Sequence, residues 1–343
     1  MQIEKKVVTN LTKCYSLAEI AYRKETAYLV ASEKQFPCLV ISRDGRVLDK
    51  VWDGPGGVMT MEPLSAGTFL ATHRFYSPND SKDASIVLAR EGDQGWEVRT
   101  LCRLPFVHRF GVLNRDGKSY IVAATLKSDH QSKDDWTCPG RIWVGELPEN
   151  LDEVNEEHPL ELKPLVSGLL CNHGFFKYEE NGYDVCLVGT ENGIWKVTPP
   201  AFDGQWHAER IFDLPASDML LADFDHDGQK ELMVLAPFHG EKLSVYKPEA
   251  GAWKKVFDAP QPLEFLHALA VSTLAGREVA VIGHRKGNRD LCLVSCDENG
   301  YRLDVLDHDV GPANVLCREE GRNLWILSAN RETDEVAMYC VKS

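Results

Sequence analysis

Six of the eleven histidines in this chain fall at two repeated positions of its sequence pattern. Three begin an apolar strand-like run: His108 in VHRFGVL, His173 in NHGFFKY and His267 in LHALAV. Three end the following run: His73 in THRF, His239 in FHGE and His284 in GHRKGN. If successive strands are antiparallel, the start of the first and the end of the second lie at the same edge of a sheet. The spacing therefore predicts a ring of imidazoles at one end of the fold.

Neutral imidazoles that converge from separate segments are typical ligands of a divalent transition metal such as Zn²⁺, Mn²⁺, Fe²⁺ or Ni²⁺. We predict that His173, His239 and His267 are the metal ligands, because they belong to successive repeats. His108, from the preceding repeat, is expected to be a fourth ligand or a general base. For any single histidine, the alternative is an ordinary polar residue that satisfies loop hydrogen bonds.

Cationic residues surround the predicted ring. Arg109 and Lys127 are assigned to catalysis, since either could stabilise an enolate or oxyanion. The residues expected to contact substrate are His73, Arg74, His130, His284 and Arg285. In a chain of net charge −14, cations gathered at one place favour an anionic or oxyanion-forming ligand. A solvated rim is the alternative interpretation.

A second group of metal-binding side chains stands in the stretch DFDHDGQKE. Asp223, Asp225, Asp227 and Glu231 offer carboxylate oxygens, and Gly228 allows a tight turn. Ca²⁺ is a hard cation that such a set suits. The alternative is a turn in which Asp and Gly serve backbone geometry and no ion binds. Because this loop is expected at the end opposite to the histidines, its predicted role is stability rather than chemistry.

Strands must position these residues, because helical periodicity is nearly absent. One module recurs seven times: a strand, a polar turn, a very apolar second strand, a third strand and a more alternating fourth. The turn and second strand are clear in MEPLSAGTFLAT (61–72), VLNRDGKSYIVAAT (112–125) and STLAGREVAVIGH (272–284). This repeat predicts an all-β fold, a seven-bladed β-propeller of four-stranded blades that forms a single domain over residues 1–343.

Ring closure is expected to involve the N-terminus. The last module ends without its fourth strand, and QIEKKVVT (2–9) has the matching alternating character. An N-terminal strand that completes the last blade would leave no exposed sheet edge at the closure. The longest insertion, LKSDHQSKDDWTCPG (126–140), lies in the third module. Long loops are often functional, and a solvated excursion is the alternative.

Composition and charge disfavour several classes of partner. The chain has 52 Asp plus Glu against 38 Lys plus Arg, so nucleic acid and anionic membranes are not expected as main partners. It has no uninterrupted run of about 18 apolar residues and no apolar N-terminal targeting segment. The ten cysteines form no CxxC pair and suit reduced core thiols. We expect a cytoplasmic protein, and the sequence leaves its oligomeric state open.

The DFDHDG turn, followed by the apolar strand ELMVL, resembles the FG-GAP or VCBS class of propeller repeats. With the histidine positions, above all NHG (172–174) and FHGE (238–241), the chain also resembles the propeller part of the aldos-2-ulose dehydratase family. In its predicted metal site it is similar to oligogalacturonate lyases. These resemblances imply a seven-bladed propeller that holds a metal on several histidines and acts on a carbohydrate.

These features together predict a metal-dependent lyase, dehydratase or isomerase that acts on a small keto-sugar or related carbohydrate. The metal would polarise a carbonyl, His108 would take the α-proton, and Arg109 or Lys127 would stabilise the enolate. Two alternatives stay open: a non-catalytic propeller that binds a protein or glycan, and a metal-assisted ester or lactone hydrolase. The sequence contains no nucleophile elbow, P-loop or dinucleotide-binding fingerprint.

Overall fold

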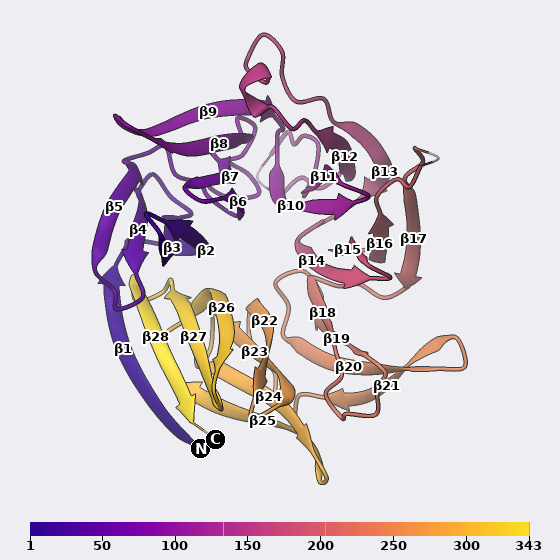
Figure 1. The fold of residues 1–343 in the computed structure, drawn as a ribbon. Coiled ribbons are helices and arrows are strands. Elements are labelled where there is room, and N and C mark those ends of the chain that lie inside the picture. The colour runs from indigo at the N-terminus through magenta and orange to yellow at the C-terminus, as the bar shows by residue number, and fades with distance from the viewer. Residues whose placement is uncertain (133, 203, 343) are drawn as a thin grey trace.

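The computed structural model describes residues 1–132, 134–202 and 204–342, so Lys133 of the long loop, Asp203 and Ser343 lie outside the described residues. Seven four-stranded antiparallel sheets stand around a central channel like the blades of a propeller (Figure 1). The prediction of an all-β, seven-bladed propeller with four-stranded blades is confirmed.

The first four blades follow one another in chain order, each from an inner to an outer strand. Blade one contains β2 (Cys14–Tyr22), β3 (Glu25–Ser32), β4 (Cys38–Ser42) and β5 (Val47–Trp52). Blade two contains β6 (Met61–Ser65), β7 (Thr68–His73), β8 (Ser85–Gly92) and β9 (Gly95–Arg103). Blade three contains β10 (Val107–Arg115), β11 (Lys118–Thr125), β12 (Gly140–Leu147) and β13 (Lys163–Leu169). Blade four contains β14 (Gly174–Glu180), β15 (Tyr183–Thr190), β16 (Gly193–Thr198) and β17 (His207–Phe212).

The last three blades complete the ring. Blade five contains β18 (Asp218–Ala222), β19 (Glu231–Ala236), β20 (Lys242–Glu249) and β21 (Ala252–Asp258). Blade six contains β22 (Leu266–Leu274), β23 (Arg277–His284), β24 (Leu291–Asp297) and β25 (Gly300–Asp307). Blade seven contains β26 (Pro312–Glu320), β27 (Asn323–Asn330), β28 (Glu335–Lys342) and β1 (Gln2–Asn10).

The N-terminal strand closes the ring as predicted. β1 pairs antiparallel with β28, from Gln2 opposite Lys342 to Asn10 opposite Glu335. The two ends of the chain therefore share one blade, as Figure 1 shows. Blade seven thus has an outer strand like its neighbours, although that strand comes from the other end of the sequence.

Burial explains the sequence pattern of the strands. The second strand of a blade packs on both faces against neighbouring blades, so it is a continuous apolar run, and Val279, Ala280, Val281 and Ile282 of β23 are all buried. Outer strands such as β21 have mostly exposed residues. All ten cysteines are free and eight of them are buried, as expected for core thiols.

Helical structure in the described residues is limited to the short 3₁₀ turn η1 (Leu151–Glu153). None of the described helices is long or apolar enough to cross a membrane.

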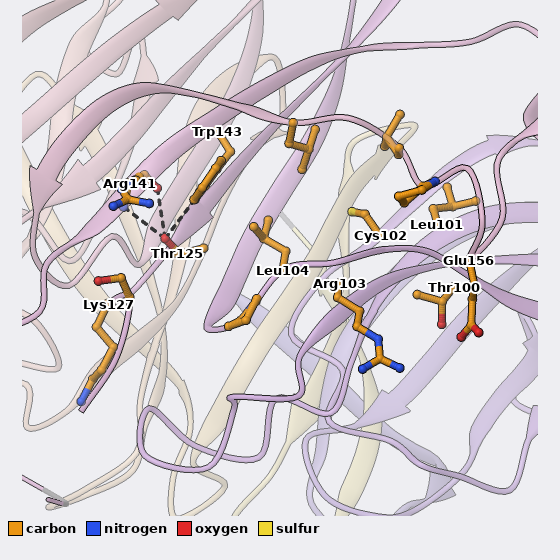
Figure 2. Close-up of a pocket in the computed structure, with 15 residues that line it drawn as sticks. Thr100, Leu101, Cys102, Arg103, Leu104, Thr125, Lys127, Arg141, Trp143 and Glu156 are labelled. Carbon is orange, nitrogen blue, oxygen red and sulfur yellow. Dashed lines mark hydrogen bonds between the residues drawn. The ribbon is translucent and has the colours of Figure 1, made fainter. Parts of the chain in front are cut away.

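A groove of about 700 Å³ lies between blades two and three, away from the inner strands. Figure 2 shows its lining, which includes Arg103, Lys127, Arg141 and Trp143. No histidine contributes to this lining. The groove is therefore distinct from the predicted ring of imidazoles.

Candidate metal centre at the channel mouth

A β-bulge at the start of an inner strand recurs in four blades. The strand pairing skips one residue between Cys14 and Ser16, Val107 and Arg109, Leu266 and Ala268, and Pro312 and Asn314. The residues skipped are Tyr15, His108, His267 and Ala313. Because a bulge leaves its extra residue out of the ladder and redirects its side chain, it can aim that side chain at the channel instead of the next blade.

Aromatic rings from several blades meet at this mouth of the channel. The ring centroids of His108 and His173 are 4.4 Å apart, those of His173 and His267 are 5.1 Å apart, and those of His267 and Tyr15 are 5.2 Å apart. His239 enters from the loop after β19, with its centroid 5.0 Å from that of His173 and 5.5 Å from that of His267. The structure thus assembles blades one, three, four, five and six around one point.

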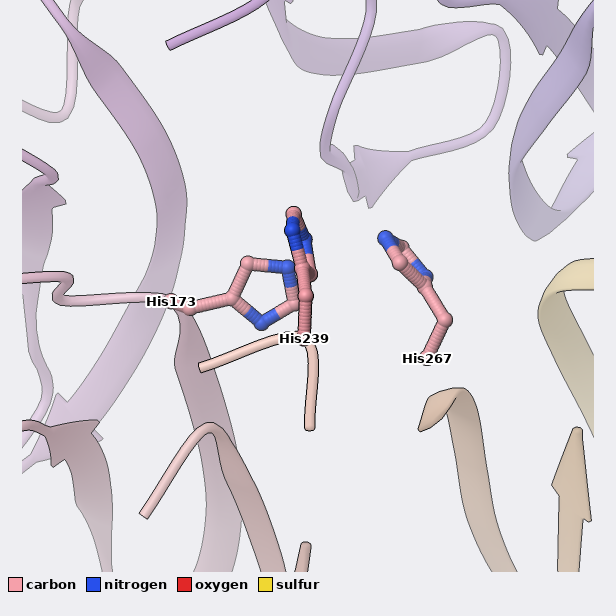
Figure 3. Close-up of side chains that lie close together, drawn as sticks. All are labelled: His173, His239 and His267. Atoms are coloured by element: carbon pink, nitrogen blue, oxygen red, sulfur yellow. The ribbon is translucent and has the colours of Figure 1, made fainter. Parts of the chain in front are cut away.

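The three histidines predicted as metal ligands form the centre of this group. Each of His173, His239 and His267 offers one ring nitrogen, and these three nitrogens all lie within 4.8 Å of one another. Figure 3 shows the three rings grouped together. Three converging imidazoles are the donor set of several catalytic metal sites, which keep further positions for a ligand.

Two of these imidazoles are oriented by backbone carbonyls of the next blade. Nδ1 of His173 lies 3.1 Å from the carbonyl oxygen of Ser217, and Nδ1 of His267 lies 2.7 Å from that of Ala313. A carbonyl oxygen only accepts, so Nδ1 carries the proton and Nε2 has the lone pair, as in histidines that bind metals. Nε2 of His173 is buried and has no hydrogen-bond partner among the described residues.

Burial keeps these imidazoles neutral. It lowers the pKa of His239 to about 3, with a further contribution from the charges of Arg285 and Lys286. Burial also holds the pKa values of His173 and His267 well below the ordinary value. Neutral imidazole is the form that binds a metal. The three neutral imidazoles are therefore suited to binding a metal cation rather than to being protonated.

His108 and Arg109 lie next to the three histidines. His108 is buried, its Nδ1 has no hydrogen-bond partner in the described part of the chain, and burial lowers its pKa well below the ordinary value. Nη1 of Arg109 donates to the carbonyl oxygen of Met59 at 2.6 Å. Arg109 also lines a channel cavity of about 250 Å³ together with Asp218, whose pKa is raised to about 6 by burial.

Partly exposed aromatic residues surround His239. Its ring stacks on those of Phe238 and Phe265, at centroid distances of 3.9 and 4.2 Å. Trp136, from the long loop of blade three, packs on Phe238 at 5.7 Å. These side chains form an aromatic wall (Trp136, Phe238 and Phe265) beside the histidines. Such a wall suits a ligand with an apolar face.

The ammonium of Lys127 is engaged with the long loop. Nζ lies 4.0 Å from the centre of the Trp136 ring, and donates to Oδ1 of Asn79 at 3.1 Å and to the carbonyl oxygen of Asp135 at 2.9 Å. These contacts place Lys127 behind the aromatic wall and make it a support for Trp136.

The other predicted substrate contacts lie in separate environments. His73 packs on Trp52 at 4.5 Å, and His130 packs on Phe106 at 5.7 Å. Nε2 of His284 accepts a hydrogen bond from the Asp290 backbone at 3.1 Å. Arg74 is exposed. Arg285 pairs with Glu332 at 3.0 Å and lies 5.0 Å over the Phe265 ring, so it reaches the edge of the aromatic wall.

The sequence pattern missed Tyr15, and it also did not identify Ser217 and Ala313. The backbone carbonyls of these two residues contact His173 and His267. Tyr15 occupies the bulge of blade one, as His108 does in blade three. Aligning KCYSLAEI with FVHRFGVL would have revealed it.

The acidic turn lies between β18 and β19, at the opposite end of blade five from Ser217. Carboxylate oxygens of Asp223, Asp225, Asp227 and Glu231 lie within 4.8 Å of one another, as a cation site requires. Nζ of Lys247 lies 2.5 Å from Asp225 Oδ2, 2.6 Å from Asp227 Oδ2 and 3.6 Å from Glu231 Oε1. The four carboxylates suit a cation, and the Lys247 ammonium already provides positive charge among them.

No family model matches the chain, and no curated protein matches it. Among solved structures, the Myceliophteria thermophila Cps50 (Swd1) β-propeller domain is 12% identical with a TM-score of 0.61, and 98% of this chain and 99% of that chain are covered. The RRP9 WD40 repeats are 10% identical with a TM-score of 0.55, covering 98% and 99%. A putative 6-phosphogluconolactonase from Bacteroides uniformis is 12% identical with a TM-score of 0.51, covering 93% and 90%. These similarities show the propeller fold, and they do not show the FG-GAP or aldos-2-ulose dehydratase resemblance.

Proposed function

We propose that this protein is a metal-dependent lyase, dehydratase or isomerase of a small keto-sugar or related carbohydrate. The observation that carries the proposal is the convergence of three neutral imidazoles, with Nε2 of His173 buried and unpartnered among the described residues. An unpaired polar atom in a buried position is costly, and a metal ligand bond would satisfy it. Zn²⁺, Mn²⁺, Fe²⁺ and Ni²⁺ all suit this donor set.

A divalent metal held by His173, His239 and His267 would supply Lewis-acid polarisation of a carbonyl. The chain supplies the remaining functions. His108 is neutral and its Nδ1 has no well-formed hydrogen bond within the part of the chain that the structure describes, so it is the group placed to take a proton from the carbon next to that carbonyl. Arg109 contributes positive charge from the channel side, where an enolate oxygen would gain from it. Trp136 and Phe238 would exclude water from one side of the substrate.

The contacts of Lys127 alter its assigned role. Its ammonium is shared between Asn79, the Asp135 carbonyl and the Trp136 ring. We therefore assign it to positioning the aromatic wall, and leave the stabilisation of negative charge to Arg109.

Metal analysis of the purified protein tests this proposal. His173→Ala and His267→Ala are each expected to abolish stoichiometric metal, because each removes one of three ligands. His284→Asn is the matched control, since His284 is buried but its nitrogens contact the Asp290 and Lys286 backbone. Metal content of both alanine variants at the level of the control would refute the metal centre.

A non-catalytic propeller that binds a protein or glycan is the second candidate. It is supported by the similarity in fold to structures described as WD40 repeats, and the partly exposed aromatic wall could serve as a contact surface. Chelator treatment separates the two candidates. Turnover that is lost with the metal supports the enzyme, whereas partner binding that survives both chelation and His173→Ala supports the binding module.

A third candidate, metal-assisted hydrolysis of an ester or lactone, would use the same histidines. It is suggested by the fold similarity to a structure described as a putative 6-phosphogluconolactonase. Proton exchange at the substrate α-carbon in D₂O distinguishes it, because hydrolysis requires none.

A further inference from the structure

Tyr15 is a polar side chain of the channel mouth that the proposed mechanism does not use. It is 2% exposed, and its hydroxyl oxygen lies 3.0 Å from Nε2 of His267. It stands on the bulge of β2, at the position that His108 and His267 occupy in their own blades. The fold therefore aims it at the same point as the histidines.

The direction of this hydrogen bond follows from the rest of His267. Nδ1 of His267 is 2.7 Å from the Ala313 carbonyl oxygen and must carry the ring proton. Nε2 is then the acceptor, and the Tyr15 hydroxyl is the donor. The lone pair that accepts this bond is the one that His267 would give to a metal. A metal and the Tyr15 hydroxyl cannot share it.

A buried hydroxyl that loses its acceptor must find another, because unpaired buried donors are rare and costly. Tyr15 is held in place by its strand and by Arg109, whose guanidinium lies 5.9 Å over the phenol ring. An oxygen atom of a ligand held by the histidine centre would supply a new acceptor. The charge of Arg109 favours an oxygen with negative character.

We propose that Tyr15 donates a hydrogen bond to an oxygen atom of the bound substrate and thereby selects small molecules with two adjacent oxygens, such as α-hydroxy ketones and α-hydroxy acids. One oxygen would face the metal and the other the phenol. This inference rests on the proposed function, since it needs a metal on the three histidines. It adds a specificity-determining residue that the histidine pattern does not contain.

Glycolate, the smallest α-hydroxy acid, is a suitable probe with the full-length protein loaded with Co²⁺. The visible spectrum of Co²⁺ reports both the metal and the ligand at its site. Tyr15→Phe is expected to bind Co²⁺ with unchanged stoichiometry and to bind glycolate about tenfold more weakly, the usual effect of one lost hydrogen bond. Tyr22→Phe is the control, because Tyr22 lies on the same strand and its hydroxyl donates to Asp49 at 2.6 Å.

Equal glycolate affinity in wild type and Tyr15→Phe would overturn the inference, as would a wild-type Co²⁺ protein that binds no glycolate. Loss of Co²⁺ from Tyr15→Phe would also overturn it, because Tyr15 would then support the metal centre rather than the ligand. Failure of the wild type to bind Co²⁺ would instead refute the histidine centre on which both proposals depend. The two failures are therefore distinguishable in one titration.

Discussion

Lys247→Met tests whether the acidic turn after β18 depends on an external cation. Lys247 places its ammonium among Asp225, Asp227 and Glu231. Methionine preserves much of the side-chain length and removes the charge. We expect the wild type to be insensitive to calcium, and the variant to lose stability that calcium restores.

The magnitude follows from the exposure of the partners. The side chains of Lys247, Asp225 and Asp227 are 24%, 31% and 37% exposed, so water screens these two pairs and each contributes at most about 1 kcal/mol. Glu231 is fully buried, and its Oε1 has no hydrogen bond among the described residues, so losing its counter-charge costs about 1–3 kcal/mol. The total is about 1–5 kcal/mol. With an unfolding entropy of about 2.1 cal/mol/K per residue, Tm should fall by about 1–7 °C.

Thermal unfolding of both proteins with and without millimolar CaCl₂ provides the assay. Lys255→Met is the control, because Lys255 is half exposed and pairs with Asp258 on an outer strand, so Tm should change by less than about 1 °C. A rise in the wild-type Tm with calcium that disappears in Asp225→Asn would refute the reasoning. The turn would then bind calcium despite the ammonium.

Three further predictions concern the histidines, the long loop and the ring closure. Because desolvation lowers the pKa of His239 from 6.5 to about 3, the unfolded state of the metal-free protein binds more protons than the folded state between these pH values. Stability measured by urea unfolding should therefore fall as pH falls from 6.5 toward 3, and a flat profile would contradict a neutral His239 in the folded state. Lys127→Met removes the hydrogen bonds to Asn79 and Asp135, so it should lower the free energy of unfolding by about 1–3 kcal/mol and speed proteolysis of the 126–140 loop. Metal content should stay normal, and loss of metal would instead favour a role for Lys127 at the histidine centre. Deleting residues 1–10 should abolish cooperative unfolding or cause aggregation on gel filtration, because β28 would become an exposed edge; a stable monomer would show that closure is dispensable.

The fold could be predicted because its signals are local. Apolar runs of the second strands and the polar turns before them recur in every blade, and each is visible within about a dozen residues. The alternating strand QIEKKVVT could be assigned to the last blade, because the last module lacked a fourth strand. The trio of His173, His239 and His267 followed from the repeat frame, since equivalent positions in a propeller lie at the same end of the channel.

The direction of side chains could not be predicted in the same way. His73 and His284 end second strands, as expected, but the structure directs them to Trp52 and to the Asp290 backbone rather than to the trio. Lys127 follows a second strand too, and its ammonium supports Trp136. The repeat pattern predicts where a residue lies along the blade, between the two ends of the channel. Which way the side chain turns depends on contacts that the pattern does not contain.

A bulge accounts for the missing residue Tyr15, which lies outside the strand pairing of blade one. Ala313 lies on the bulge of blade seven and Ser217 directly precedes β18, and their carbonyls contact His267 and His173. Small side chains at these two positions leave space for the imidazoles of His173 and His267, while their carbonyls fix the tautomer that exposes Nε2.

His108 also faces the backbone of the next ring residue, His173, but its Nδ1 makes no well-formed hydrogen bond among the described residues. An imidazole whose Nδ1 is anchored presents one lone pair in a fixed direction, which suits a metal ligand. An imidazole without that anchor can exchange a proton more readily. This difference supports our proposal that His173 and His267 would hold the metal and that His108 would act as the base.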